Sequence, residues 1–142
     1  MIIRKITEND VPFLAEIEEQ CFADCRNENT LRDELKYDYT VYYAAVEDNK
    51  VVGYVSGNVI CGECDITRIA VEANFRRKGI AKALLDFLKN KTEKITLEVR
   101  EGNFAAIALY EKCGFKKDFV RKNYYKDPIE NAVLMSFEKE RK

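Results

Sequence analysis

Catalysis by this chain would have to proceed without histidine, because none of its 142 residues is one. That absence excludes Ser-His-Asp and Cys-His arrangements and histidine-ligated metal sites. A general base must therefore be a carboxylate, a tyrosine, a lysine or a cysteine. Glu98 is one candidate, since alternation along residues 95–100 places its side chain on the face opposite Ile95, Leu97 and Val99.

Tyr110 is a second candidate, and it lies on a helix expected over residues 103–112. Asn103, Ile107 and Tyr110 are spaced i, i+4 and i+7, so they share one face of that helix. Only a few residues separate the helix from the strand that carries Glu98, so Glu98 and Tyr110 can line one cleft. Each residue also has an ordinary interpretation: a strand glutamate is commonly solvated, a tyrosine half-buried, and an asparagine a helix cap.

A basic loop that contains a glycine precedes another expected helix, and its sequence is Arg76-Arg77-Lys78-Gly79-Ile80-Ala81. Such a loop presents free backbone N–H groups and the positive end of the helix dipole, which is how proteins hold phosphates. Gly79 lets the backbone approach a ligand without an intervening Cβ. The alternative is an ordinary solvated turn before a helix.

The five cysteines favour free thiols. An odd count, in a chain whose start is no signal peptide, is typical of a reducing compartment. The pairs Cys21-x3-Cys25 and Cys61-Gly-Glu-Cys64 can also be read as a four-thiolate zinc site. The first spacing is loose, however, and the second pair falls where a β-turn is needed. We therefore expect no metal, and we interpret Cys113 as structural.

Length and charge narrow the class of protein. The chain fits one domain, expected over residues 1–142, with an ordinary globular balance of 46% hydrophobic and 35% charged residues. A formal net charge of -1 gives no global field that would recruit nucleic acid, so any affinity for phosphate must be local. No apolar run approaches membrane length, and we expect a cytoplasmic protein with no membrane partner.

Hydrophobic periodicity predicts the element order β-α-α-β-β-β-α-β-α-β-β. The strands are expected over residues 2–6, 41–46, 51–60, 64–71, 95–99, 116–120 and 132–137, with a polar segment at 122–131 before the last strand. The helices are expected from residue 9 or 10 to 21, over 30–35, from the basic loop to about residue 90, and over 103–112. This order predicts an α+β fold of three layers, a mixed central sheet with helices on both faces. Ligands of such sheets bind at the carboxyl ends of the strands, where the loop 76–81 falls.

Three blocks of the sequence resemble the GCN5-related N-acetyltransferase (GNAT) superfamily. They are the run from Ile69 to Ala81, the block Leu97-Glu98-Val99-Arg100-x-x-Asn103-x-x-Ala106-x-x-Leu109-Tyr110-x-x-x-Gly114-Phe115, and the block Arg121-x-Asn123-Tyr124-Tyr125. Within the superfamily the chain is most similar to the bacterial ribosomal protein alanine N-acetyltransferases and related protein N-terminal acetyltransferases. The resemblance implies the GNAT acyl-CoA N-acyltransferase fold and acetyl-CoA as co-substrate. It also implies a protein N-terminus as acceptor, such as that of a ribosomal protein that begins with alanine.

The same resemblance assigns the cofactor-binding residues. Backbone groups of Ile69, Ala70 and Val71 would pair with the pantetheine arm of acetyl-CoA, which would lie in a gap between two splayed parallel strands. The amides of residues 76–81 would hold the pyrophosphate, and Asn103 would contact the cofactor.

For catalysis, the resemblance makes Glu98 the general base, directly or through water, and Tyr110 the general acid toward the departing thiolate. The amine would attack directly in a ternary complex. Tyr124 and Tyr125 would hold the N-terminal backbone of the acceptor, although aromatic cover over the end of the sheet is their ordinary interpretation. Residues 21–26 stand where relatives often carry a Pro-Trp-Ser-type segment that helps to shape the acceptor pocket. Two alternatives stay open: transfer to a small amine such as a polyamine or amino sugar, and an acyl-CoA-binding module without catalysis.

Overall fold

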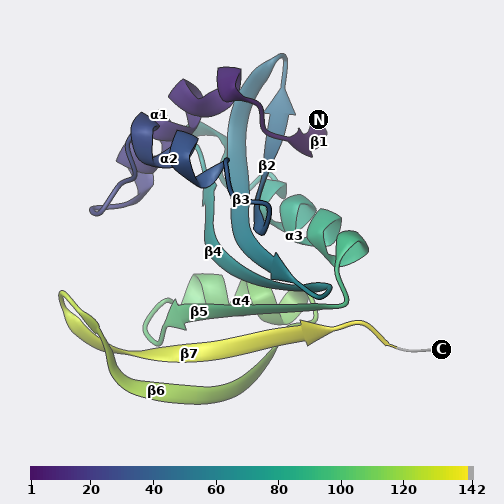
Figure 1. Cartoon of the computed structure of the whole chain (residues 1–142). Coiled ribbons are helices and arrows are strands. Elements are labelled where there is room, and N and C mark those ends of the chain that lie inside the picture. The colour runs from purple at the N-terminus through teal and green to yellow at the C-terminus, as the bar shows by residue number, and fades with distance from the viewer. Residues whose placement is uncertain (141–142) are drawn as a thin grey trace.

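Seven strands form one mixed sheet in the order β1-β2-β3-β4-β5-β7-β6 (Figure 1). The structure, a computed structural model, describes residues 1–140. Strands β4 and β5 run parallel, and the other neighbouring strands run antiparallel. The strands are β1 (Ile2–Lys5), β2 (Thr40–Glu47), β3 (Lys50–Ile60), β4 (Glu63–Val71), β5 (Lys94–Arg100), β6 (Lys116–Lys126) and β7 (Ile129–Glu138).

Helices cover both faces of this sheet, which confirms the three-layer arrangement expected from the element order (Figure 1). Helices α1 and α2 pack on one face in a core that includes Leu14, Leu31 and Tyr54. Helices α3 and α4 pack on the other face in a larger core that includes Leu84 and Ile95. The helices are α1 (Val11–Cys21), α2 (Glu28–Glu34), α3 (Ile80–Lys91) and α4 (Phe104–Lys112), with short 3-10 turns at Glu8–Asp10 and Ala73–Phe75.

The two parallel strands separate soon after they meet. Residues 63–65 of β4 pair with residues 94–96 of β5, and the pairing stops there. In Figure 1, β4 then continues upward beside β3, while β5 stays with β7 in the lower part of the sheet. From Ile66 onward the side of β4 that faces β5 therefore has no strand partner among residues 1–140. This divergence leaves an opening at the carboxyl ends of both strands.

The prediction of a polar segment over residues 122–131 is wrong. Strand β6 continues to Lys126 and β7 begins at Ile129, so a two-residue turn joins them. The reason is that β6 is an edge strand: ten of its eleven residues are exposed, and Tyr125 is half-buried. A strand that buries neither face need not alternate apolar and polar residues, so its sequence reads as a polar loop.

The other elements lie within a few residues of their expected positions. Helix α2 begins at Glu28 rather than at residue 30, because the Asn27 side chain caps it by accepting a hydrogen bond from the Thr30 amide at 2.9 Å. Helix α4 ends at Lys112, and Gly114 follows with a φ of 92°, as expected for a residue that stops a helix. No helix within residues 1–140 is both long enough and apolar enough to cross a membrane.

Candidate active site

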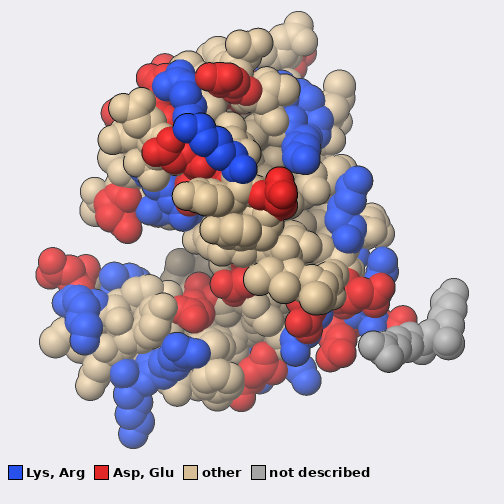
Figure 2. Space-filling model, in the orientation of Figure 1, with Lys and Arg blue, Asp and Glu red and all other residues tan. Residues whose placement is uncertain are grey.

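A cleft of about 840 Å³ opens where β4 and β5 diverge. Its walls come from the loop between α1 and α2, from residues 66–69 of β4, from residues 97–100 of β5, and from α4 and β6. Figure 2 shows the space-filling surface deeply hollowed between its upper and lower parts, with Lys, Arg, Asp and Glu on both sides of the opening. Both candidate catalytic residues, Glu98 and Tyr110, line this cleft.

Glu98 lies on the open side of β5. Its neighbours Leu97 and Val99 are 3% and 6% exposed, whereas Glu98 itself is exposed, so the alternation predicted for this strand is confirmed. Glu98 forms no ion pair within residues 1–140, although three other charged residues of the cleft, Arg26, Arg68 and Arg100, each have an acidic partner. The Glu98 carboxylate is therefore not neutralised by a neighbouring cation, and its two oxygens have capacity to accept hydrogen bonds from a ligand.

Two tyrosines of β6 lie near Glu98. A hydrogen bond to the Glu98 carboxylate raises the pKa of Tyr124, and burial together with the Glu98 charge raises the pKa of Tyr125. Arg100 stacks on the Tyr125 ring at 4.3 Å from its centroid and holds the ring in place. Tyr125 lines the cleft, whereas Tyr124 is 43% exposed and touches Glu98 from outside the lining. Both phenols stay protonated at neutral pH and can donate hydrogen bonds.

Tyr110 projects from α4 and is 7% exposed. Burial, reinforced by the nearby Tyr125 and Cys113, raises the pKa of Tyr110 to about 12. Its ring packs against Phe115 with the centroids 5.8 Å apart. Within the part of the chain that the structure describes, its hydroxyl has no hydrogen-bond partner, so it is available to a ligand in the cleft.

The basic loop 76–81 borders a second hollow, of about 200 Å³, together with Val71, Phe75 and Leu109. Gly79 is the N-cap of α3 and has a φ of 79°, a left-handed conformation that glycine adopts without strain. The first helical hydrogen bond runs from the Ala83 amide to the Gly79 carbonyl, so the amides of the first turn are unused by the helix. A Cβ placed on Gly79 would meet no atom within 4 Å, which means that this position faces open space.

Strand β4 and helix α4 connect the two hollows. Ile69 lines the cleft, and Val71, two residues later on β4, lines the hollow at the basic loop. On α4, Tyr110 lines the cleft and the adjacent Leu109 lines the hollow at the basic loop. On its other side, β4 pairs with β3 through Val55↔Ile69, Tyr54↔Ala70 and Gly53↔Val71. An extended ligand lying along the open side of β4 would therefore reach both the loop and Glu98.

Asn103 lies in the cleft lining, but its side chain already has a structural role. Its Oδ1 accepts a hydrogen bond from the Ala106 amide at 3.2 Å and caps α4. This is the ordinary interpretation of an asparagine at a helix start. The cap leaves the second lone pair of Oδ1 and the whole amide NH₂ group available to a ligand.

Several charged residues of the cleft were not among the sequence candidates. Asp24 and Arg26 lie on the α1–α2 loop, Arg68 on β4, and Asp127 at the turn after β6. Arg68 did carry a signal, because it is the one charged residue in the mainly apolar run from Ile66 to Val71. The loop residues carried a signal only through the family resemblance, which places residues 21–26 at the acceptor pocket, because a polar loop between helices is ordinarily solvated.

The cysteines are free thiols, and they occupy different environments. Burial raises the pKa of Cys113 and raises the pKa of Cys64 to about 12. The Cys21 thiol lies 3.3 Å from Arg76 of the basic loop, and Cys25 and Cys61 are exposed. Within residues 1–140, no three cysteine, aspartate and glutamate side chains are grouped so that they could hold a metal ion.

Comparison with known proteins shows which family the sequence matches. A model described as the acetyltransferase (GNAT) family matches residues 11–115. The [ribosomal protein bS18]-alanine N-acetyltransferase of Escherichia coli is 32% identical over 141 residues, covering 94% of this chain and 95% of that protein. The N-alpha-acetyltransferase of Saccharolobus solfataricus is 41% identical over 122 residues, covering 73% and 72%.

A solved structure of one such relative has the same fold as this chain. The crystal structure of the ribosomal-protein-S18-alanine N-acetyltransferase from Escherichia coli superposes with a TM-score of 0.85 at 30% identity. The superposition covers 96% of this chain and 92% of that one. The similarity thus extends over the sheet, the cleft and the basic loop together.

Proposed function

The chain belongs to the GNAT family of acetyltransferases and is an acetyl-CoA-dependent N-acetyltransferase with the GNAT fold, and from this premise we propose that it acetylates the N-terminal α-amino group of a protein. The observation that carries the proposal is the cleft between β4 and β5, where Glu98, a carboxylate without an ion-pair partner among residues 1–140, and the Tyr110 phenol, without a hydrogen-bond partner there, line the same space. Similarity over nearly the whole chain to an enzyme named for ribosomal protein alanine favours an acceptor of that kind, a ribosomal protein that begins with alanine.

We assign the donor site to β4 and the basic loop. The open side of β4 at Ile69–Val71 offers backbone groups to the amides of the pantetheine arm, as an added strand would. The unused amides of residues 76–81 and the positive end of α3 suit the pyrophosphate. Asn103 is proposed to contact the same ligand with its free amide group.

We assign Glu98 as the general base, acting directly or through one water. An α-ammonium group has a pKa near about 8, so at neutral pH it must lose a proton before it can attack a thioester. The Glu98 carboxylate lines the cleft and has no ion-pair partner in the described chain, so it can receive that proton from an amine bound there. Most of the acceleration then comes from holding amine and thioester together.

We assign Tyr110 as the proton donor to the departing thiolate. A free thiol has a pKa of about 8.5, so protonating an exposed thiolate from a phenol near 12 would be uphill by about 5 kcal/mol. Burial raises the pKa of a thiol as well, and the buried Cys64 thiol of this protein has a pKa of about 12. Burial therefore reduces the pKa difference between the phenol and the departing thiol. The Tyr110 hydroxyl therefore stabilises the thiolate first by a hydrogen bond and then by proton transfer.

We assign Tyr124 and Tyr125 to the backbone of the acceptor. Both hydroxyls remain protonated at neutral pH and lie beside Glu98, so they can donate hydrogen bonds to the first carbonyl groups of a peptide whose amine points at Glu98. This placement fixes the distance between the acceptor nitrogen and the base.

A competition assay tests the proposal. The protein is incubated with acetyl-CoA and a mixture of peptides that begin with Ala, Ser, Gly or Met, one Ala peptide whose amine is already blocked, spermidine and an aminoglycoside, and products are identified by mass spectrometry. We expect acetylation of the free Ala peptide and none of the blocked one. Acetylation of the small amines alone would contradict the proposed acceptor and favour a small-molecule acetyltransferase. Binding of CoA without acetylation of any amine would indicate a module without catalysis.

Two further proposals concern the whole protein. We propose that residues 1–142 form one N-acetyltransferase domain, which is supported by a single sheet that includes all seven strands of the described chain and separates its two cores. We also propose a cytoplasmic location, because all five cysteines are free thiols, the state that reducing compartments maintain.

A further inference from the structure

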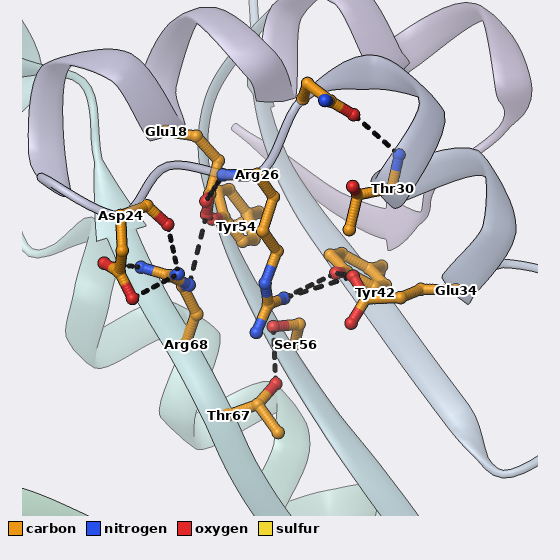
Figure 3. A network of polar contacts seen from close by, with 11 residues as sticks. Glu18, Asp24, Arg26, Thr30, Glu34, Tyr42, Tyr54, Ser56, Thr67 and Arg68 are labelled. Atoms are coloured by element: carbon orange, nitrogen blue, oxygen red, sulfur yellow. Dashed lines mark hydrogen bonds and ion pairs between the residues drawn. The ribbon is translucent and has the colours of Figure 1, made fainter.

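Glu18 is a charged residue with no exposed surface, and the catalytic assignments above make no use of it. It lies on α1, and its carboxylate points toward the sheet (Figure 3). One oxygen accepts a hydrogen bond from the backbone amide of Arg26 at 2.8 Å. The other accepts a hydrogen bond from the Tyr54 hydroxyl and lies 3.6 Å from Nε of Arg68. Because a buried carboxylate is costly unless it is paired and hydrogen-bonded, all of these contacts are needed to keep it there.

Arg68 carries the connection from Glu18 to the cleft. Its side chain is 11% exposed and leaves β4 one residue before Ile69, and Figure 3 shows it between Glu18 and Asp24. The guanidinium donates to the Asp24 carbonyl at 3.0 Å and to the Asp24 carboxylate at 3.4 Å. It also stacks on the Phe22 ring at 4.1 Å from the centroid. Arg68 thus holds both Phe22 and Asp24.

Arg26 holds the far end of the same loop. Beyond the hydrogen bond from its amide to Glu18, its guanidinium donates to the Tyr42 hydroxyl at 2.7 Å and pairs with Glu34 at 3.3 Å. These contacts attach the loop to β2 and α2. Residues 22–26 are therefore fixed at several points although they contain no regular secondary structure.

We propose that Glu18 and Arg68 are positioning residues for the acceptor: they fix residues 22–26 as the wall of the cleft that faces Glu98. The proposal rests on the proposed function, since it takes the acceptor amine to bind in this cleft. Phe22, Asp24 and Arg26 all line the cleft, and all three are held directly by Glu18 or Arg68. The loop does not border the hollow at residues 76–81 that is assigned to the pyrophosphate, so we expect its displacement to weaken binding of the acceptor far more than binding of the donor.

The first test is steady-state kinetics of Glu18→Gln with an Ala-starting peptide. Glutamine keeps the size but removes the charge that Arg68 faces, and its neutral amide oxygen accepts a weaker hydrogen bond from the Arg26 amide than the carboxylate does. We expect the KM for peptide to rise by about tenfold, the loss that follows from one charged hydrogen bond. The KM for acetyl-CoA and kcat should stay within about twofold of the wild type, because the donor site and Glu98 are untouched.

Asp10→Asn is the matched control. Asp10 is 6% exposed and pairs with Arg4 at 2.7 Å, so it is also a buried carboxylate of the α1 region paired with an arginine. It does not line the cleft. We expect this variant to lower the melting temperature without changing either KM. Equal effects of Asp10→Asn and Glu18→Gln on the peptide KM would overturn the proposal, because a general loss of stability would then explain the change in KM.

A direct readout of the loop separates this proposal from the proposed function. Hydrogen exchange of the Arg26 amide should become about tenfold faster in Glu18→Gln and stay unchanged in Asp10→Asn, whichever amine the protein acetylates. If the wild type acetylates only small amines, the proposed acceptor fails, and the positioning proposal is tested by the KM for that amine. An unchanged acceptor KM in a folded Glu18→Gln protein, or unchanged exchange at Arg26, overturns the proposal.

Arg68→Lys keeps the proposal testable if Glu18→Gln does not fold. Lysine retains the charge beside Glu18 but loses the stacking on Phe22 and the double contact with Asp24. We expect the same selective rise in the acceptor KM. A rise confined to the KM for acetyl-CoA would overturn the proposal, because Arg68 would then act on the donor strand.

Discussion

Replacing Gly79 tests whether the open space before α3 holds the pyrophosphate. The glycine has a φ of 79° and a ψ of 13°, and a Cβ there would touch no atom within 4 Å. In the free protein Gly79→Ala therefore costs only the strain of a left-handed backbone, about 1–2 kcal/mol. For a chain of this size that cost lowers the melting temperature by roughly 3–8 °C.

Binding of CoA should respond to Gly79→Ala through a second effect. The added methyl group would project into open space at the hollow that Gly79 and the first turn of α3 border, so it should raise the Kd for CoA by more than about tenfold, the equivalent of one lost charged hydrogen bond. Gly79→Asn separates the two effects. Asparagine tolerates the left-handed conformation and should recover much of the lost melting temperature, but its side chain still fills the space.

The assay is thermal unfolding of the free protein, followed by isothermal titration calorimetry with CoA, for the wild type and both variants. We expect Gly79→Asn to be more stable than Gly79→Ala and to bind CoA no better. Wild-type affinity in Gly79→Ala would refute the assignment of the phosphate to this space. Recovery of affinity together with stability in Gly79→Asn would show that backbone conformation alone controls binding.

Three further predictions concern Glu98, Tyr110 and Cys64. Glu98→Gln should lower kcat/KM by about 10²–10⁴-fold at pH 7 and by less at pH 9.5, where the acceptor amine deprotonates unaided. Initial rates that fall by the same factor at both pH values would contradict the role of Glu98 as base. Tyr110→Phe should lower kcat at least about tenfold and leave the melting temperature unchanged, because the hydroxyl has no partner in the described chain; wild-type turnover would remove its assigned role. Burial raises the pKa of the Cys64 thiol from 9.0 to about 12, so folding favours the protonated thiol. This contribution to the free energy of unfolding is complete below pH 9 and is lost as pH rises toward 12, by about 4 kcal/mol in all. Denaturant unfolding of Cys64→Ala from pH 7 to 11 should therefore show a shallower decline than the wild type, and parallel curves would contradict this.

The strand that carries Glu98 could be predicted from sequence because both of its faces are defined. Leu97 and Val99 must be buried against α4 and β7, so the period of two places Glu98 outward. Strand β6 could not be predicted in full for the opposite reason. Its residues bury neither face, so no alternation marks where the strand ends, and Tyr124 and Tyr125 were expected on a polar segment.

The contacts of Glu18 show why the role proposed for it could not be predicted from the sequence. Its partners Tyr54 and Arg68 are 36 and 50 residues away in the sequence, and only the folded sheet brings them together. One local signal was present: Leu14, Glu18 and Cys21 are spaced i, i+4 and i+7, so the glutamate lies on the buried stripe of α1. A charge on an otherwise apolar helix face predicts a buried partner, although it does not identify which residue supplies it.

The divergence of β4 from β5 is the feature that sequence alone could suggest only through the family resemblance. Polar and apolar residues are interspersed along both strands, and nothing in either sequence marks the point after Asp65 and Thr96 where pairing stops. The opening is nevertheless what brings Ile69, Glu98 and Tyr110 to one cleft.

The most direct test of the account is to find which nitrogen receives the acetyl group. A peptide that begins with alanine and contains one internal lysine is incubated with the protein and acetyl-CoA at pH 7, and tandem mass spectrometry locates the product. The lysine amine has a pKa of about 10.4 against about 8 for the α-amine, and only the α-amine is followed by a backbone that Tyr124 and Tyr125 can hold. We expect acetylation of the α-amine alone, abolished in Glu98→Gln. Acetylation of the lysine, or of neither nitrogen by a protein that binds acetyl-CoA, would contradict the account.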